Sequence, residues 1–332
     1  MKRSRFCFVA ALAAALVLGL GSLALADPVN FTFATFIPPN EPASEVGLWI
    51  EKDLNEKPGS LIKAKYFHSQ QMGNEIEIVK KVRMGTLNAA LCPSTYAPDL
   101  NPKFGVATLA YCMNSYEKWE AFRKEKALRD ELFLCLQGIG LRTLDFCYFG
   151  VYGLATTKPV STLDDLKAMK MRTTQARYPL AFWHALGVRP VPMAWGDVFP
   201  ALKQGVVEGT DQTENVMRLR LTDVCKYFTK TDHMVGLFYL LVNDKWYQGL
   251  DAKAREQLDQ AVAENFAKAR EASMKLTQEA PAELKAKGVT VINLPKEEMD
   301  KFRQAQRGVW KEFEPEVGKE WLDKITLFSA QF

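Results

Sequence analysis

Residues 164–175, DDLKAMKMRTTQ, place an arginine in a segment that otherwise has the pattern of a short buried strand. The segment predicts a linker and a strand that carries Arg172 to its carboxyl end. Ligands of α/β sheets gather at such ends, in the loops that follow the strands. A guanidinium there forms two parallel charge-assisted hydrogen bonds with a carboxylate. The stretch therefore predicts either a site for an acidic ligand or an ion pair with an acidic side chain such as Asp211.

The residues that follow continue the alternation of helix and strand. The pattern predicts a helix, a short strand leading to Trp195, a second helix closed by Gly205 and a further strand, over residues 174–186, 191–193, 196–205 and 206–209. Because these strands are separated by helices, we expect them to be neighbours in one sheet. Arg172, Trp195 and Gln212 would then lie at three neighbouring strand ends.

Earlier in the chain, short β-rich runs also alternate with helical patterns. Strands are predicted at 29–36, 61–68 and 87–94, and helices at 44–56 and 74–85. Strands separated by helices of this length favour parallel pairing in an α/β sheet. The loops that would carry ligand contacts are therefore 36–40, which begins with Phe36, and 93–96, which contains Thr95 and Tyr96.

A long helix is predicted in the last third of the chain. Asp251 is a good N-cap, and residues 252–280 contain neither Gly nor Pro and carry apolar residues at helical spacing. About 29 residues would span roughly 43 Å, more than the width of one small lobe. We therefore expect the helix to contact two lobes and to be interrupted near Pro281. A short strand at 289–294 and amphipathic helix follow.

The N-terminus has the pattern of a secretory signal peptide. MKRSRF carries three basic residues, an apolar run rich in Ala and Leu follows, and Ala24-Leu25-Ala26 supplies small residues before a cut. The alternative is a transmembrane anchor, which needs about 20 apolar residues and usually has no such cleavage site. We expect a signal peptide over residues 1–26 and an exported, periplasmic protein.

The charge balance excludes one class of partner. The chain has 43 Lys and Arg against 39 Asp and Glu, and three of the basic residues belong to the predicted signal peptide. The net charge of the remainder is close to zero, so there is no broad basic surface for nucleic acid. Any positive charge that matters must be local.

Enzymatic motifs are not found. His68, His184 and His233 are scattered, and no GxSxG, HExxH, GxGxxG or phosphate-binding loop is present. Glu75 and Glu77 lie two residues apart on a predicted helix and face different directions, which argues against a catalytic carboxylate pair. We expect no catalytic residue, no cofactor and no metal.

The cysteines after the signal peptide are five in number and have no zinc-ligand spacing. Cys112 and Cys135 could pair in an oxidising compartment. Buried, unpaired thiols are the interpretation that we favour.

Residues 164–172, DDLKAMKMR, resemble the DLKGLKIR element of the extracytoplasmic solute-binding proteins of TRAP transporters, the DctP-type family. The continuation over 185–209, ALGVRPVPMAWGDVFPALKQGVVEG, is similar to the GA-P-PMA-E-Y-AL-G-VDG signature of that family. The likeness extends in element order over almost the whole chain after the signal peptide. Ala168 stands where the family usually has glycine.

The resemblance implies an α/β fold, a two-lobed periplasmic binding protein (type II-like) with a long helix spanning both lobes. Lobe 1 would comprise residues 27–149 and 238–277, and lobe 2 residues 150–237 and 278–332. The implied function is to capture an organic acid by closure of the lobes and to deliver it to the TRAP membrane permease, as a monomer. A secreted α/β enzyme acting on small carboxylic acids is the alternative, and a sensor with the same fold is a third.

The resemblance implies a role for individual residues of this chain. Arg172 falls on the carboxylate-binding arginine, and Gln212 where many members have an asparagine that hydrogen-bonds the ligand. Gln175 occupies a polar ligand-facing position and Trp195 an aromatic one. Tyr152 falls where sialic-acid-binding members carry a second arginine. The candidate ligand-binding residues are Arg172, Gln212, Trp195, Tyr152, Gln175, Phe36, Tyr96, Thr95 and Glu75.

Tyr152 argues against a site with two cations, so the sequence favours a ligand with one carboxylate. Aromatic residues at or near predicted strand ends favour a flat or apolar ligand. They are Phe36, Tyr96, Phe149, Tyr152, Trp183 and Trp195. At least half of them, Trp183 above all, are expected to be packing residues. Simple dicarboxylates remain open as ligands.

Overall fold

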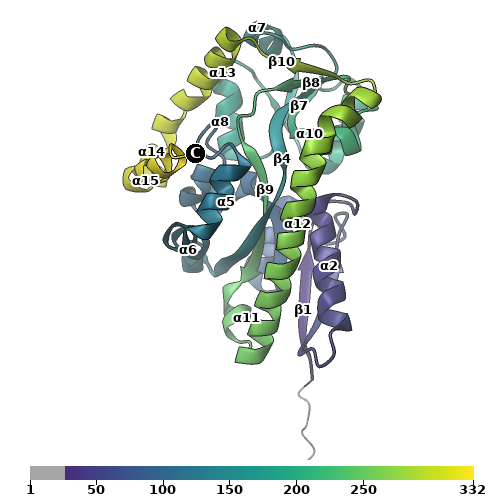
Figure 1. The fold of residues 1–332 in the computed structure, drawn as a ribbon, viewed down its shortest axis with the longest axis vertical. Coiled ribbons are helices and arrows are strands. Elements are labelled where there is room, and N and C mark those ends of the chain that lie inside the picture. Colours follow the sequence, from purple (N-terminus) through teal and green to yellow (C-terminus); the bar gives the residue numbers. More distant parts are fainter. Residues whose placement is uncertain (1–26) are drawn as a thin grey trace, which may run out of the picture.

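The computed structural model describes residues 27–332, and the predicted signal peptide lies outside the described residues. The chain forms two lobes, arranged along the long axis of the molecule (Figure 1). The main path of strands has the order β2-β1-β3-β9-β4-β7-β5-β6, with β8 paired to β4 and β10 paired to β8. Helices cover the sheets, so the molecule has the predicted α/β, two-lobed fold.

Lobe 1 is built on the parallel strands β2, β1 and β3, with β9 antiparallel to β3. Residues of β2 alternate between buried and exposed, as expected for a strand with one face on the core. The elements of this lobe are β1 Val29–Ala34, α2 Pro42–Glu56, β2 Ile62–Phe67, α3 Glu75–Met84, β3 Ala89–Pro93, α4 Ala97–Leu100, α5 Tyr116–Lys124, α6 Lys126–Leu134, β9 Val235–Asn243 and α11 Asp244–Gln248. The predicted strands and helices are present, with ends that differ by at most two residues.

Lobe 2 contains the strands that the opening stretch predicted. Its elements are α7 Leu163–Lys167, β5 Met171–Thr173, α8 Arg177–Ala185, β6 Val191–Pro192, α9 Val198–Lys203, β7 Gly209–Thr213, α10 Glu214–Val216, β8 Tyr227–Lys230, β10 Thr290–Asn293 and α13 Lys296–Gly308. Strand β5 pairs in parallel with β6 on one side and β7 on the other. The strand predicted at residues 206–209 is displaced along the chain: β7 begins where that strand was predicted to end. Gln212 therefore lies within β7.

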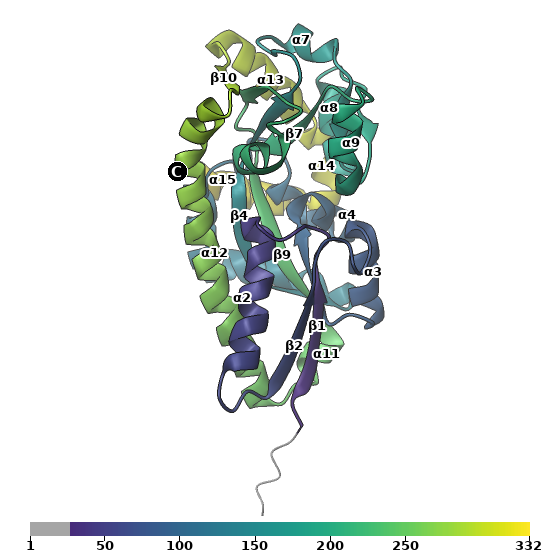
Figure 2. The same ribbon diagram turned by 90° about the vertical axis from the view of Figure 1, so that its right-hand side faces the viewer.

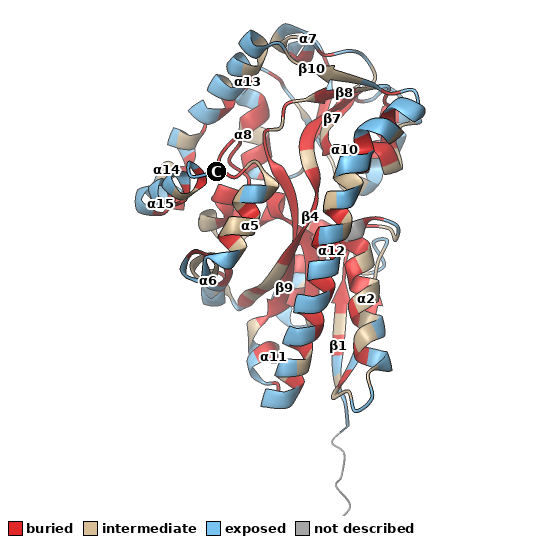
Figure 3. Cartoon of the chain, viewed as in Figure 1, coloured by how far each residue is buried: buried red, intermediate tan, exposed pale blue. Residues whose placement is uncertain are grey.

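One of the segments that join the two lobes is a strand that was missed in the sequence. Strand β4, Leu141–Thr156, pairs with β9 along its first part and with β7 and β8 along its last residues. All of these pairings are antiparallel, whereas the predicted parallel pairing is confirmed for β1, β2 and β3. Residues of β4 are mostly buried, and the strand therefore lacks the alternation that marks a half-exposed strand. The buried colouring along β4 and β9 is visible in Figure 3.

Gly150 lies where β4 leaves lobe 1. Its φ of +124° is a conformation that residues with a side chain rarely adopt, and an added Cβ would lie 2.6 Å from Thr213 Cβ. The register with β9 also shifts between Tyr148 and Gly150. The predicted boundary at residues 149 and 150 coincides with this irregularity. The assignment of residues to lobes remains a prediction.

Helix α12, Ala252–Ala286, is the long helix that spans both lobes. It contacts α2 in lobe 1 and β10 in lobe 2, and Figures 1 and 2 show it running along the molecule beside α2. Asp251 caps it by accepting hydrogen bonds from the N–H groups of Lys253 and Ala254. The predicted interruption at Pro281 is wrong. The helix continues for a further turn because Leu284 packs into the core of lobe 2, which favours the helical path despite the lost hydrogen bond.

The last helices are α14 Trp310–Val317 and α15 Lys319–Ser329. They pack against residues 102–107, and Trp321 Nε1 donates to the Lys103 carbonyl at 3.1 Å. That segment belongs to the predicted lobe 1, although the sequence placed residues 278–332 with lobe 2. The C-terminal helices therefore contact both lobes. No helix within residues 27–332 is both long and apolar enough to cross a membrane.

Candidate functional site

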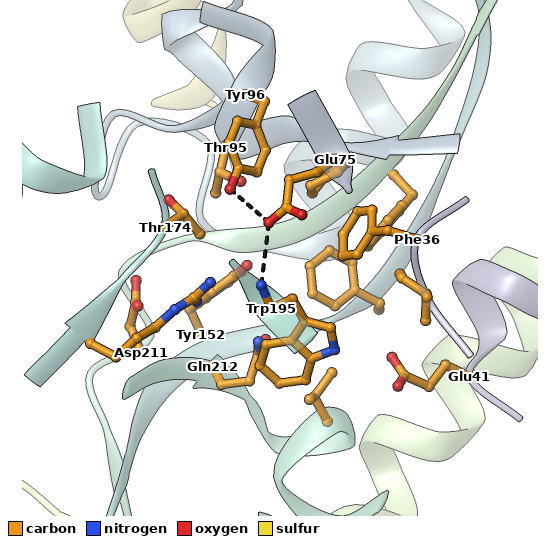
Figure 4. A pocket seen from close by; sticks show the side chains of 16 residues that line it. Phe36, Glu41, Glu75, Thr95, Tyr96, Tyr152, Thr174, Trp195, Asp211 and Gln212 are labelled. Carbon is orange, nitrogen blue, oxygen red and sulfur yellow. Dashed lines mark hydrogen bonds between the residues drawn. The ribbon is translucent and has the colours of Figure 1, made fainter. Parts of the chain in front are cut away.

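A pocket lies where the strand ends of the two lobes face each other (Figure 4). Both lobes and the connecting strands contribute to it. The lining residues are Phe36, Ile37, Glu41, Glu75, Pro93, Thr95, Tyr96, Phe149, Tyr152, Arg172, Thr174, Trp195, Asp211, Gln212, Val216 and Phe238. Eight of the nine candidate residues from the sequence are among them. Their contacts with a ligand remain a prediction.

The sheet of lobe 2 brings Arg172, Trp195 and Gln212 together. Arg172 lies in β5 beside Val191 of β6 and Thr210 of β7. Trp195 begins the turn after β6, and Gln212 is near the end of β7. The predicted meeting of three neighbouring strand ends is confirmed. Strand β5 has three residues, so Arg172 lies one residue before its end, and Thr173 still pairs with Pro192 of β6.

Arg172 is 2% exposed and is held by backbone rather than by an acid. Its Nε and Nη2 donate to the Met193 carbonyl oxygen at 3.2 and 2.8 Å. The guanidinium carbon lies 5.8 Å from the centre of the Trp195 ring. Within the described residues it forms no ion pair with a carboxylate. Burial lowers the pKa of Arg172, because water that would stabilise the charge is excluded.

Asp211 is the acid that the sequence offered as an alternative partner for Arg172. It lines the same pocket, and its charge opposes the lowering of the Arg172 pKa. The two side chains nevertheless do not form an ion pair in the part of the chain that the structure describes. Burial raises the pKa of Asp211 to about 6, while the nearby Arg172 acts in the opposite direction. The positive charge of Arg172 is therefore only partly compensated, because Asp211 is near it without forming an ion pair.

Glu75 enters the pocket from lobe 1. It is the first residue of α3, whose N-cap Asn74 forms a capping box with Glu77. Its Oε1 accepts hydrogen bonds from Tyr96 Oη at 2.9 Å and from the Trp195 backbone N–H at 3.4 Å, drawn as dashed lines in Figure 4. Its Oε2 is buried and has no hydrogen-bond partner among the described residues. The hydrogen bond to Trp195 links the two lobes across the pocket.

Aromatic side chains form much of the remaining wall. Tyr152 is buried beside Phe149, whose ring centre lies 5.8 Å away. Phe149 in turn packs edge-on against Phe238, at 4.8 Å between ring centres, and the ring centre of Phe36 lies 6.3 Å from that of Phe238. Burial raises the pKa of the Tyr152 hydroxyl above its ordinary value, so this residue acts as a neutral phenol. The wall is apolar with one hydroxyl set into it.

Thr95 and Thr174 bring two further hydroxyl groups to the pocket. Both oxygens are buried and lack a hydrogen-bond partner in residues 27–332. Thr174 was not a candidate; it occupies the position directly after β5. Gln175, which was a candidate, is exposed and does not line the pocket, because the chain has turned outward one residue beyond Thr174.

Glu41 was missed in the sequence. It lines the pocket and accepts a hydrogen bond from Arg220 Nε at 2.7 Å, while Arg220 Nη2 donates to the Pro39 carbonyl at 3.0 Å. Burial raises the pKa of Glu41, and Arg220 opposes that effect. The two residues are 179 positions apart, so no local pattern could have paired them. This ion pair, like the hydrogen bond from Trp195 to Glu75, joins the two lobes beside the pocket.

Trp183 and the histidines do not belong to this pocket. Trp183 packs in the core of lobe 2, as expected. His233 is buried, and burial lowers its pKa to about 4, so it is neutral near pH 7. The five cysteines after residue 26 are all free thiols, and four are buried. Among the residues that the structure describes, no group of three His, Cys, Asp or Glu side chains could hold a metal ion.

Comparison with known proteins agrees with this architecture. Residues 33–316 match the family described as bacterial extracellular solute-binding protein, family 7. A C4-dicarboxylate-binding periplasmic protein, DctP, of Rhodobacter capsulatus is 26% identical over 316 residues, covering 94% of this chain and 92% of the relative.

Solved structures show the same fold. The sugar acid binding protein DctPAm of Advenella mimigardefordensis, in complex with galactonate, has a TM-score of 0.85 at 21% identity, covering 92% of this chain and 99% of the other. A TRAP periplasmic solute-binding protein of Anaerococcus prevotii with bound D-glucuronate has a TM-score of 0.85 at 20% identity, with coverage of 92% and 99%. Because the family model matches residues 33–316, the chain belongs to family 7 of the bacterial extracellular solute-binding proteins.

Proposed function

We propose that this protein captures an organic acid with one carboxylate in the periplasm and delivers it to the membrane permease of a TRAP transporter. The observation that carries the proposal is Arg172, a buried guanidinium without an ion-pair partner among residues 27–332, at a strand end in a pocket between two lobes. A buried charge of this kind is stabilised by a ligand of opposite charge. The family to which the chain belongs supports the solute-binding role.

The ligand carboxylate would bind Arg172, whose planar fork matches its two oxygens. The Gln212 amide and the hydroxyls of Thr95 and Thr174 would hydrogen-bond polar groups of the ligand. Burying these hydroxyls without a partner costs about 1–3 kcal/mol each, and a ligand would remove that cost. Trp195 and Phe36 would cover the apolar part of the ligand from opposite lobes.

Capture would proceed by closure of the two lobes. Arg172 and Trp195 come from lobe 2, whereas Phe36, Thr95 and Tyr96 come from lobe 1, so only the closed state makes every contact. The segments that would bend are the connections between the lobes, β4, β9 and α12. Binding to the closed state alone shifts the population toward it in proportion to the difference in affinity.

A single carboxylate is favoured by the composition of the pocket. The relative from Rhodobacter capsulatus binds C4 dicarboxylates, whereas galactonate and glucuronate, the ligands of the two solved structures, each carry one carboxylate. The number of carboxylates on the ligand of this protein must therefore be inferred from its own pocket. Arg172 is its one basic lining residue within the described chain, and Tyr152 stands where a second arginine would be needed. A second carboxylate would be buried without a cation, at a large desolvation cost.

A competition experiment tests the proposal. A thermal-shift screen over carboxylates first identifies ligands, because binding to the native state alone raises stability by about 2.7 kcal/mol at a hundredfold excess over Kd. A bound monocarboxylate with an aromatic or bulky apolar group is then challenged with succinate or malate at equal concentration. We expect the monocarboxylate to remain bound. Displacement by succinate would show that the site provides a second positive group for it.

A further inference from the structure

The charges around the pocket are unbalanced. Its lining contains one basic side chain, Arg172, and three acidic ones, Glu41, Glu75 and Asp211, in the part of the chain that the structure describes. Glu41 has its own ion-pair partner in Arg220. Asp211 lies on the same lobe as Arg172 and offsets its charge. Glu75 remains, and it enters from the opposite lobe.

Glu75 is a carboxylate whose hydrogen bonds are incomplete. The side chain is 2% exposed, and both donors that reach it, Tyr96 and the Trp195 N–H, bind the same oxygen, Oε1. No cationic side chain in residues 27–332 forms an ion pair with it. Its Oε2 is buried and unpartnered. In Figure 4 the Glu75 carboxylate lies on one side of the pocket, with Asp211, Trp195 and Gln212 on the other.

An anionic ligand satisfies this arrangement only in part. Its carboxylate would be stabilised by Arg172, and a hydroxyl of the ligand could donate to Oε2 of Glu75, but the pocket would still gain a negative charge without a second cation. A buried acceptor or charge without a partner is costly in free energy. A ligand with a cationic nitrogen would donate a charge-assisted hydrogen bond to Glu75 and would remove both costs.

We infer that the ligand is zwitterionic, with a carboxylate for Arg172 and a cationic N–H donor for the buried, unpartnered oxygen of Glu75. This inference rests on the proposed function, because it requires the ligand carboxylate to bind Arg172. It adds a requirement that the proposed function does not contain. The two groups of the ligand would bind opposite lobes, so the closed state would be stabilised from both sides.

Matched ligand series test the inference on the unaltered protein. The first series contains ω-amino acids from 4-aminobutanoate to 6-aminohexanoate. The second contains the alkanoates in which a methyl replaces the ammonium, pentanoate to heptanoate, and the third the dicarboxylates glutarate to pimelate. The same three head groups on a phenyl spacer give 4-(aminomethyl)benzoate, 4-ethylbenzoate and 4-(carboxymethyl)benzoate. Thermal shift ranks all twelve, and calorimetry measures those that bind.

We expect the best zwitterion to bind at least about tenfold more tightly than its methyl isostere, as a charged hydrogen bond implies. Glu75→Gln should reduce that ratio to near one. Glu271→Gln removes the same charge from the exposed face of α12 and should leave the ratio unchanged. Retained ligand-independent melting of both variants would show that they fold.

The outcomes separate this inference from the proposed function. If an alkanoate or a dicarboxylate binds as tightly as its zwitterion, or if no zwitterion binds at all, the inference is overturned. The proposed function survives that result where another carboxylate still binds and depends on Arg172. If no compound with a carboxylate binds, both fail. A preference for the zwitterion that persists in Glu75→Gln would overturn the role of Glu75.

Discussion

At the scale of single residues, Arg172 is the side chain on which the proposed ligand binding depends most. Two of its nitrogens are already committed to the Met193 carbonyl, and this fixes the plane of the guanidinium. A plane that is fixed before the ligand arrives reduces the entropy lost on binding. Charge alone would not provide that orientation, so lysine should be a poor substitute.

We therefore predict that Arg172→Lys weakens carboxylate binding although the charge is kept. Truncating one partner of a buried, hydrogen-bonded charge pair typically costs about 2–5 kcal/mol, and Arg172→Ala should fall in that range. Calorimetry measures both. Arg189→Lys, the same change at an exposed site of lobe 2, serves as the control and should bind normally. Unchanged affinity in both Arg172 variants would remove this residue from the site.

Asp211 makes ligand binding depend on pH. Burial raises its pKa from 3.8 to about 6, so near neutral pH it carries a negative charge beside the carboxylate site. As pH falls below about 6, Asp211 takes up a proton and no longer repels the ligand carboxylate, which has a pKa of about 4 and stays ionised. We predict tighter binding at about pH 5.5 than at pH 7.5. Calorimetry on Asp211→Asn should show no such difference, and a difference that persists would assign the effect to another group.

The same group affects the stability of the ligand-free protein, with a sign that follows from its raised pKa. Because the folded state binds the proton more tightly than the unfolded state, the contribution of Asp211 is fully present below about pH 4. It is lost as pH rises through about 6. Comparison of denaturation by urea in the wild type and in Asp211→Asn over this interval would reveal it.

At the scale of elements, short local patterns were enough to predict most of the fold. Strand β2 alternates between buried and exposed residues, α3 has its cap and its closing Gly85, and α12 begins at Asp251, so each could be predicted from its own residues. Strand β4 could not, because a strand buried on both faces has no period of two. The continuation of α12 beyond Pro281 depends on distant packing, which the local sequence does not contain.

The same limit applies to the site. Arg172 and Trp195 follow predictable strands, so their meeting could be predicted. Gln175 was carried over from the family resemblance, whereas in this chain Thr174, one residue earlier, lines the pocket and Gln175 is exposed. The pairing of Glu41 with Arg220 joins segments that only the folded chain brings together.

Helix α3 offers a prediction at this scale, because its N-cap holds Glu75 in place. Asn74 accepts hydrogen bonds from the N–H groups of Ile76 and Glu77. Asn74→Ala should lower the free energy of unfolding by about 1 kcal/mol and should also weaken ligand binding. Ser115→Ala removes the N-cap of α5, outside the pocket lining, and should affect stability only. Denaturation by urea together with calorimetry distinguishes these effects, and normal affinity in Asn74→Ala would contradict the link.

At the scale of the whole molecule, the pocket is divided between the two lobes, and two polar contacts beside it join them. Across the cleft, Glu75 accepts from the Trp195 N–H, and Glu41 pairs with Arg220. An exposed ion pair contributes at most about 1 kcal/mol to the stability of a protein. In a partly buried pair, the attraction between the charges is offset by the cost of removing them from water. Contacts of this strength leave room for a ligand to decide the balance between open and closed states.

Small-angle X-ray scattering tests this account most directly, with a ligand from the thermal-shift screen. On saturation, the radius of gyration of the wild-type protein should decrease as the lobes close around the ligand, and Arg172→Ala should show no decrease at the same ligand concentration. Identical scattering of the wild-type protein with and without saturating ligand would contradict capture by closure and would indicate a rigid cleft.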